Sequence, residues 1–131
     1  RTPTLASGLT GDLASLRAAI NGLEIVPGTV IDSGLRTATA ELVGPRAETA
    51  NTSVIVLLTD GQNNAGPEPV RKAAADARRR GIRLYTVALG ADADIALMRE
   101  IVGDPSRAFV ALEPADLERI YSEISGLIGC P

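Results

Sequence analysis

Two apolar runs in the second half of the chain predict strands. Residues 54–58 read Val-Ile-Val-Leu-Leu, and residues 82–89 form a second, longer run. Continuous runs of this length, rich in β-branched side chains, are typical of strands buried on both faces of a parallel sheet. Residues 108–112 predict a short third strand. Residues 2–9 alternate only weakly and contain Pro3, which predicts an edge strand.

Segments with helical spacing of apolar side chains lie between these runs. They predict helices over residues 12–21, 29–43, 67–80, 95–102 and 114–128. Asp12 provides an N-cap for the first helix, Pro67 suits the first turn of the third, and Gly81 marks the end of that helix. Strands that alternate with helices favour an α/β fold with a parallel sheet, and 131 residues fit one domain.

Composition excludes several kinds of chemistry. The chain has no histidine, which rules out histidine general bases and the common histidine-containing zinc sites within these residues. The net charge of −3 and the lack of an aromatic platform argue against a nucleic-acid partner. No apolar run approaches the roughly 20 residues that a membrane span requires. The single cysteine, Cys130, is either a spare thiol or half of a disulfide to a cysteine elsewhere, which would imply an oxidising compartment.

Asp60 and Thr29 are the candidates for ligand chemistry. Asp60 follows the strand at 54–58, and ligands of parallel sheets bind beyond the carboxyl ends of the strands. A carboxylate beside buried apolar surface needs a cation, a hydrogen-bond donor or a proton. Both residues also have a local explanation. Asp60-Gly61 is a common turn pair, and the segment from Thr29 to Asp32 has the spacing of a capping box.

Four segments, in this order along the chain, resemble the von Willebrand factor type A (vWA) domain. Residues 27–35 resemble the Gly-Thr segment that leads into a helix of that family. Residues 54–61 resemble its fourth strand with the aspartate loop, and residues 81–90 resemble its fifth strand. Phe109 and residues 114–128 resemble its closing segment. Each segment alone is a weak signal, but their joint occurrence over nearly the whole chain is specific.

The resemblance implies a Rossmann-like three-layer sandwich with a mostly parallel central sheet flanked by helices. It also implies a metal-ion-dependent adhesion site in which Thr29 and Asp60 bind a divalent cation. Mg²⁺ is the expected ion, with Mn²⁺ or Ca²⁺ as alternatives, because hard cations take oxygen ligands. A carboxylate from a partner protein would fill the open coordination position. Gln62, Asn63 and Asn64 would lie on the partner-binding rim, although solvation of a polar loop also explains them.

The function implied by the resemblance is that of a non-enzymatic adhesion or assembly module. In such a module the metal bridges two proteins and no bond is broken. The resemblance further implies an extracellular or cell-surface location, with Cys130 paired to a cysteine that precedes the first strand of the domain.

One motif of the family is missing. The metal site begins with Asp-x-Ser-x-Ser after the first strand, and Asp32-Ser33-Gly34 lacks that spacing. Compared with the family, residues 1–131 are expected to form a partial domain, from the third strand to the final helix. The first two strands of the family lie between its third and fourth strands. We expect them to come from another polypeptide or from sequence outside these residues, because an unpaired central strand exposes backbone donors and acceptors.

Two alternatives to the adhesion module stay open at this point. The first is a vWA scaffold that has lost its metal site. The second is a receiver-like domain in which Asp60 accepts a phosphoryl group. A receiver also needs a lysine at the end of a later strand, whereas the single lysine, Lys72, falls on a predicted helix. Enzymes of other classes lack support, because the chain has no GxSxG, GxxxxGK[ST] or GxGxxG motif.

Other charged groups have structural explanations. Asp92 and Asp94 follow the second strand, where capping of the next helix is the simpler interpretation. The basic triplet at residues 78–80 ends a predicted helix, where positive charge interacts favourably with the helix dipole.

Overall fold

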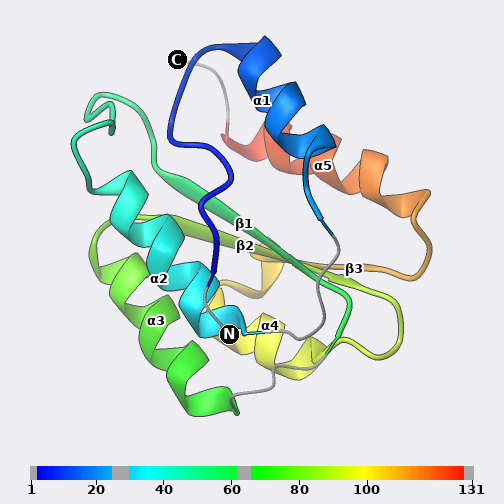
Figure 1. Cartoon of the computed structure of the whole chain (residues 1–131). Helices are drawn as coiled ribbons and strands as arrows, with labels where there is room; N and C mark the ends of the chain where they lie inside the picture. The colour runs from blue at the N-terminus through cyan, green and yellow to red at the C-terminus, as the bar shows by residue number, and fades with distance from the viewer. Residues whose placement is uncertain (1–2, 25–29, 62–65, 129–131) are drawn as a thin grey trace.

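The computed structural model describes residues 3–24, 30–61 and 66–128. Within these residues, helices alternate with three strands, as the predicted α/β fold requires (Figure 1). The elements are α1 (Leu13–Asn21), α2 (Ile31–Leu42), β1 (Val54–Thr59), α3 (Pro67–Arg79), β2 (Arg83–Leu89), α4 (Ile95–Ile101), the 3-10 turn η1 (Pro105–Arg107), β3 (Ala108–Ala111) and α5 (Asp116–Ile128).

The three strands form one parallel sheet in the order β1-β2-β3. Thr59 pairs with Ala88, and Leu89 pairs with Ala111, so all three strands end at the same edge of the sheet. The loops that follow the strands therefore share one surface, which is where parallel sheets place their ligand sites.

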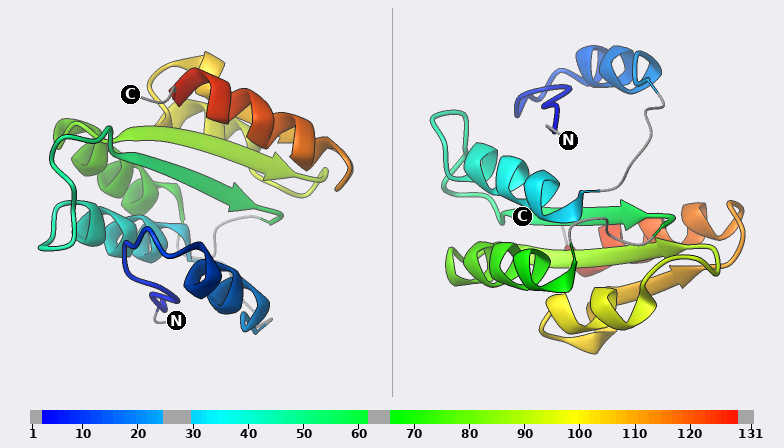
Figure 2. Two further views of the ribbon diagram at one scale, coloured as in Figure 1. Left: turned by 90° about the horizontal axis from the view of Figure 1, so that it is seen from above. Right: turned by 60° about the horizontal axis from the view of Figure 1, so that its bottom comes forward.

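Helices cover both faces of the sheet. Helices α2 and α3 lie on one side and α5 lies on the other (Figure 2). The core on the first side also includes α4. The alanines of α3 allow that helix to approach the sheet closely. Its buried residues include Leu35 of α2, Val70, Ala74 and Ala77 of α3, Leu84 and Ala88 of β2, and Leu97, Met98 and Ile101 of α4. The core on the second side consists of Tyr85, Val87, Ala111, Ile120 and Ile124. The predicted α/β sandwich is therefore confirmed.

Strand β1 is less covered than its sequence predicts. Ile55 is buried, but Leu58 exposes 43% of its surface, so burial on both faces holds only in part. The reason is its position, because no other described strand pairs with the second edge of β1. The backbone carbonyl of Ser53 accepts a hydrogen bond from the Arg83 N–H of β2. The backbone N–H and C=O groups of successive residues in a strand point to opposite edges. Those of Val54, Val56 and Leu58 therefore point to the unpaired edge.

The edge strand predicted for residues 2–9 is wrong over residues 3–9, which contain no strand. No described strand lies beside them, and they lead into α1, which Asp12 caps as predicted. Helix α1 buries none of its side chains, and Leu13 and Ile20 are 66% and 64% exposed. In Figure 2 this helix stands away from the sheet. The first 24 residues thus add little to the core.

A polar clamp attaches the N-terminal segment to the end of α2. Glu41 accepts a hydrogen bond from the Leu9 N–H at 2.9 Å. The Arg46 guanidinium donates to both oxygens of the same carboxylate, at 2.6 and 2.7 Å. These bonds, with Arg46 first and Leu9 second, lower the pKa of Glu41 from 4.5 to about 2.

Two helices begin later than predicted. Helix α2 starts at Ile31, and α5 starts at Asp116 after a turn in which the Asp116 N–H donates to the Glu113 carbonyl. The short turn η1 before β3 was not predicted; Asp104 stabilises it by accepting the Ser106 N–H. Among the described helices, none has the length and apolar character needed to cross a bilayer.

Candidate functional site

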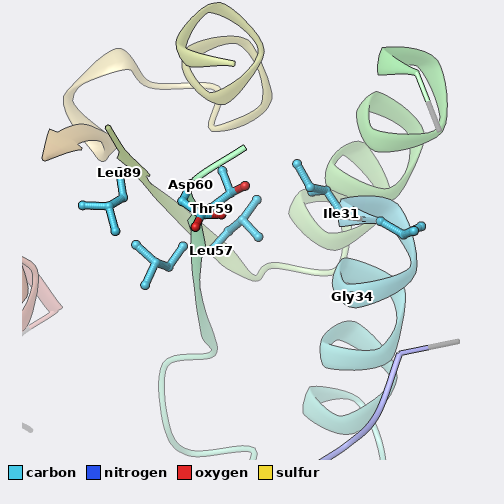
Figure 3. A pocket seen from close by; sticks show the side chains of 8 residues that line it. Ile31, Gly34, Leu57, Thr59, Asp60 and Leu89 are labelled. Carbon is cyan, nitrogen blue, oxygen red and sulfur yellow. The ribbon is translucent and has the colours of Figure 1, made fainter. Parts of the chain in front are cut away.

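A cleft of about 400 Å³ opens at the carboxyl end of β1 (Figure 3). It lies between the ends of β1 and β2 and the start of α2. In Figure 3, Asp60 and Thr59 stand between Leu89 of β2 and Ile31 of α2. Its lining residues are Val30, Ile31, Gly34, Leu57, Leu58, Thr59, Asp60 and Leu89. The walls are mainly apolar, and Asp60 is the one charged residue among these eight.

Thr59, and not Asp60, forms the turn after β1. Its hydroxyl donates to the Gly61 carbonyl at 3.2 Å, and the Gly61 N–H approaches the same hydroxyl at 3.4 Å. Asp60 is exposed, and no hydrogen bond or ion pair joins its side chain to another described residue. The local explanation, in which Asp60 accepts neighbouring N–H groups, therefore has no support in this part of the chain. Asp60 is instead a free carboxylate at the edge of an apolar cleft.

The start of α2 borders this cleft, but the capping box predicted there is not complete. The N-cap position is Val30, and no side chain caps it. Asp32, which would have to return a hydrogen bond, uses Oδ2 to pair with Arg36 at 2.5 Å. Its Oδ1 is buried and has no hydrogen-bond partner among the described residues. The spacing of Asp32 and Arg36, four residues apart on a helix, is the sequence signal that would have predicted this pair.

Five of the predicted site residues lie outside the described residues. They are Thr29, the rim residues Gln62, Asn63 and Asn64, and the disulfide candidate Cys130. Their roles stay predictions.

The remaining charged candidates are where the sequence placed them. Asp94 caps α4 by accepting the Leu97 N–H at 3.1 Å, which confirms the capping interpretation for this residue. Asp92 is exposed in the same loop. Lys72 lies on α3 and not at the end of a strand, so it does not supply the lysine that a receiver domain needs.

Asp60 fits a metal site as one ligand but not as the whole site. Its free carboxylate is the kind of oxygen donor that Mg²⁺ or Mn²⁺ binds. Among the described residues, however, no group of three acidic or cysteine side chains is close enough to hold an ion. Any metal at this cleft needs further ligands from elsewhere.

The sequence profile of the von Willebrand factor type A domain matches residues 4–123. The chain belongs to this family. Membership confirms the fold that the four sequence segments suggested, and it replaces the receiver-like interpretation of Asp60. No match was found among curated proteins.

Several solved structures resemble the fold of this chain. Proximal thread matrix protein 1 from the mussel byssus, with a zinc-occupied MIDAS motif, is 27% identical at a TM-score of 0.70; the match covers 85% of this chain and 28% of that one. The pilus adhesin SpaC from Lactobacillus rhamnosus GG is 16% identical at a TM-score of 0.75, covering 90% and 21%. Manganese-loaded TRAP protein from Plasmodium vivax is 18% identical at 0.69, covering 89% and 46%.

The vWA chain spans only part of each of these proteins. It matches 27% to 29% of the length of the three mussel structures. SpaC, TRAP and one of the three mussel structures are less than 25% identical to the chain, and they show the shared fold alone. The zinc-occupied motif belongs to the mussel protein, and the bound manganese belongs to the TRAP protein.

Proposed function

We propose that residues 1–131 are part of a single vWA domain that binds a partner protein through a divalent cation held at Asp60. The observation that carries this proposal is the free Asp60 carboxylate in a cleft at the carboxyl end of a parallel strand. Thr29, two residues before the start of α2, is the second proposed ligand. Mg²⁺ is the proposed ion, and Mn²⁺ and Ca²⁺ are the alternatives.

The cation would supply positive charge at the open end of the cleft. A carboxylate of the partner protein fits this role, because hard divalent ions prefer oxygen ligands and tolerate exchange of a bound water. Asp60 would hold the ion, and the apolar cleft walls would restrict access of water to one side of it. Gln62, Asn63 and Asn64 follow Asp60 in sequence and are proposed to contact the partner.

Further strands are proposed to complete the sheet at β1. The outward-pointing backbone groups of Val54, Val56 and Leu58 have no described strand beside them, and such an edge favours pairing with another strand. A strand carrying Asp-x-Ser-x-Ser, parallel to β1 at this edge, would bring its aspartate and serines to the end of the sheet where Asp60 lies. The same addition would supply the ligands that the described residues lack.

We infer an adhesion or assembly role in place of catalysis. It is supported by the names of the relatives, which include a byssus matrix protein and a pilus adhesin. A cell-surface or secreted location and a disulfide from Cys130 to a cysteine outside these residues are parts of the same proposal.

Metal titration of the natively purified protein tests the proposal. Calorimetry with Mg²⁺ and Mn²⁺ should show one site, and Asp60→Ala should abolish it. Asp92→Ala is the matched control, because Asp92 is also an exposed aspartate in a strand-end loop, and this variant should bind metal normally. Intact-mass and sequence measurements on the same material should reveal a polypeptide carrying Asp-x-Ser-x-Ser. Equal metal binding by wild type and Asp60→Ala would refute the site.

The second candidate is a vWA scaffold without metal. It is favoured by one observation, the absence of a three-ligand acidic group among the described residues. Under this alternative, neither ion binds the complete protein, and Asp60→Ala has no effect on the affinity for a partner.

A further inference from the structure

The described segments at the strand ends around the Asp60 cleft carry negatively charged residues and no positively charged ones. Apart from the start of α2, where Asp32 is paired with Arg36, the described loops and helix starts at this end are residues 60–61, 66–68, 90–95 and 112–116. They contain no lysine or arginine. Their acidic residues are Asp60, Glu68, Asp92, Asp94, Glu113 and Asp116.

Three of these carboxylates form hydrogen bonds or an ion pair within the domain. Asp94 caps α4, the Asp116 carboxylate accepts the Glu113 N–H at 3.2 Å, and Glu68 pairs with Arg71. Helix starts favour such negative charge because of the helix dipole. These three need no binding partner to explain them.

The other three carboxylates, Asp60, Asp92 and Glu113, are different. Each is exposed, and none forms a hydrogen bond or ion pair through its side chain with another described residue. One follows each of the three strands, and the register places these strand ends side by side. They are not close enough to form a three-ligand ion site. They are therefore separate negative charges along the edge of the sheet at which the cleft opens.

Positive charge is concentrated at the opposite end of the sheet. Four arginines lie between residues 78 and 83, where α3 ends and β2 begins. Arg79 and Arg80 share a single carboxylate, that of Asp76. The domain thus has a negative end at the cleft and a positive end away from it. Charge of one sign around a binding site attracts partners of the other sign and repels like charge.

We infer that the partner of this site is a basic protein surface, in which the metal-binding carboxylate is flanked by lysines or arginines. This inference rests on the proposed function, because it assigns the chemistry around the partner's carboxylate. A carboxylate in an acidic surface would meet Asp92 and Glu113 as like charges. The same carboxylate between basic side chains would reach the metal while its neighbours pair with those two residues.

Three synthetic peptides test the inference on the natively purified protein with saturating Mn²⁺. Each has nine residues; the first has a central aspartate between lysines, the second a central aspartate between glutamates, and the third a central asparagine between lysines. At low salt the lysine-flanked aspartate should bind about tenfold more tightly than the glutamate-flanked one. The ratio should fall towards one as sodium chloride rises to about 0.5 M, because salt screens exposed charges. Equal binding of the two aspartate peptides at low salt, or no binding by either, overturns the inference.

Variants of the protein locate the effect. Asp92→Asn with Glu113→Gln should weaken binding of the lysine-flanked aspartate by about threefold at low salt and leave metal affinity unchanged. The matched control, Glu48→Gln with Glu123→Gln, removes two exposed carboxylates away from the strand ends and should change neither. An equal loss in both double variants contradicts a local effect.

The asparagine peptide separates this inference from the function on which it rests. If it binds as well as the lysine-flanked aspartate, and chelation of the metal changes neither, the metal-mediated function is wrong. The preference for basic flanks over acidic flanks would still be supported in that case.

Discussion

Leu58→Lys on β1 distinguishes a covered strand from a bare one. Leu58 exposes 43% of its surface and lies next to the unpaired edge. At a bare edge, a lysine keeps part of its stem on the apolar surface and extends its ammonium group into water. Full burial of a leucine side chain is worth about 1.5–3 kcal/mol. With nearly half of that surface already exposed, the substitution should cost about 1 kcal/mol of unfolding free energy.

A covering strand changes this value. If further strands pair with β1, the space beside Leu58 is enclosed, and an ammonium group there has no water and, with Asp60 engaged by the proposed cation, no partner. Unpaired buried charge costs several kcal/mol, so we expect Leu58→Lys to destabilise the native protein by about 3 kcal/mol or more. This is a large share of the roughly 5–15 kcal/mol that holds a domain folded.

Urea unfolding of the natively purified protein, followed by circular dichroism, measures the difference. Leu112→Lys is the matched control, because Leu112 follows β3 and is 72% exposed, so its substitution should cost under about 0.5 kcal/mol. A cost for Leu58→Lys within about 1 kcal/mol of the control would refute the proposal that strands cover β1.

Three further outcomes are expected. Amide exchange at Val56 and Leu58 should be slowed more than about 100-fold in the native protein if their outward N–H groups pair with a strand, and rapid exchange would contradict that pairing. Because the pKa of Glu41 is lowered to about 2, its clamp should stabilise the fold above pH 4.5 and lose this effect as pH falls towards 2; urea midpoints at pH 5 and 3 should differ less in Glu41→Gln. Gly81 has φ of +81°, so Gly81→Ala should cost about 1 kcal/mol in thermal unfolding, whereas Gly126→Ala, inside α5 with open space around it, should stabilise by up to about 1 kcal/mol.

The sequence predicted the elements from residue 54 onward, apart from the short turn η1, because their signals are local. Apolar runs predicted β1 and β2, and Pro67 and Asp94 marked the starts of α3 and α4. The prediction of a strand was wrong over residues 3–9 because a strand forms only where a neighbouring strand can pair with it. Weak alternation gives no pairing partner, and no described strand lies beside these residues.

The candidate site was predictable only in part. Asp60 was found from its place after a buried strand, and the structure adds that Thr59 closes the turn and leaves the carboxylate free. The pairing of Asp32 with Arg36 was missed because the capping-box spacing offered Asp32 another partner. Asp60, Asp92 and Glu113 follow strands that end at a common edge, and that edge depends on strand register, which is a property of the sheet and not of any one segment.

The composition of β1 has a practical consequence for producing the chain. Residues 53–59 contain no charged residue and no proline, the features that commonly keep an open strand from joining other molecules. Residues 1–131 made alone should therefore cluster during expression and accumulate in inclusion bodies. Co-expression with a segment that contains the strands proposed to cover β1 should bring the same residues into the soluble fraction, so the soluble yield in a bacterial lysate tests candidate segments.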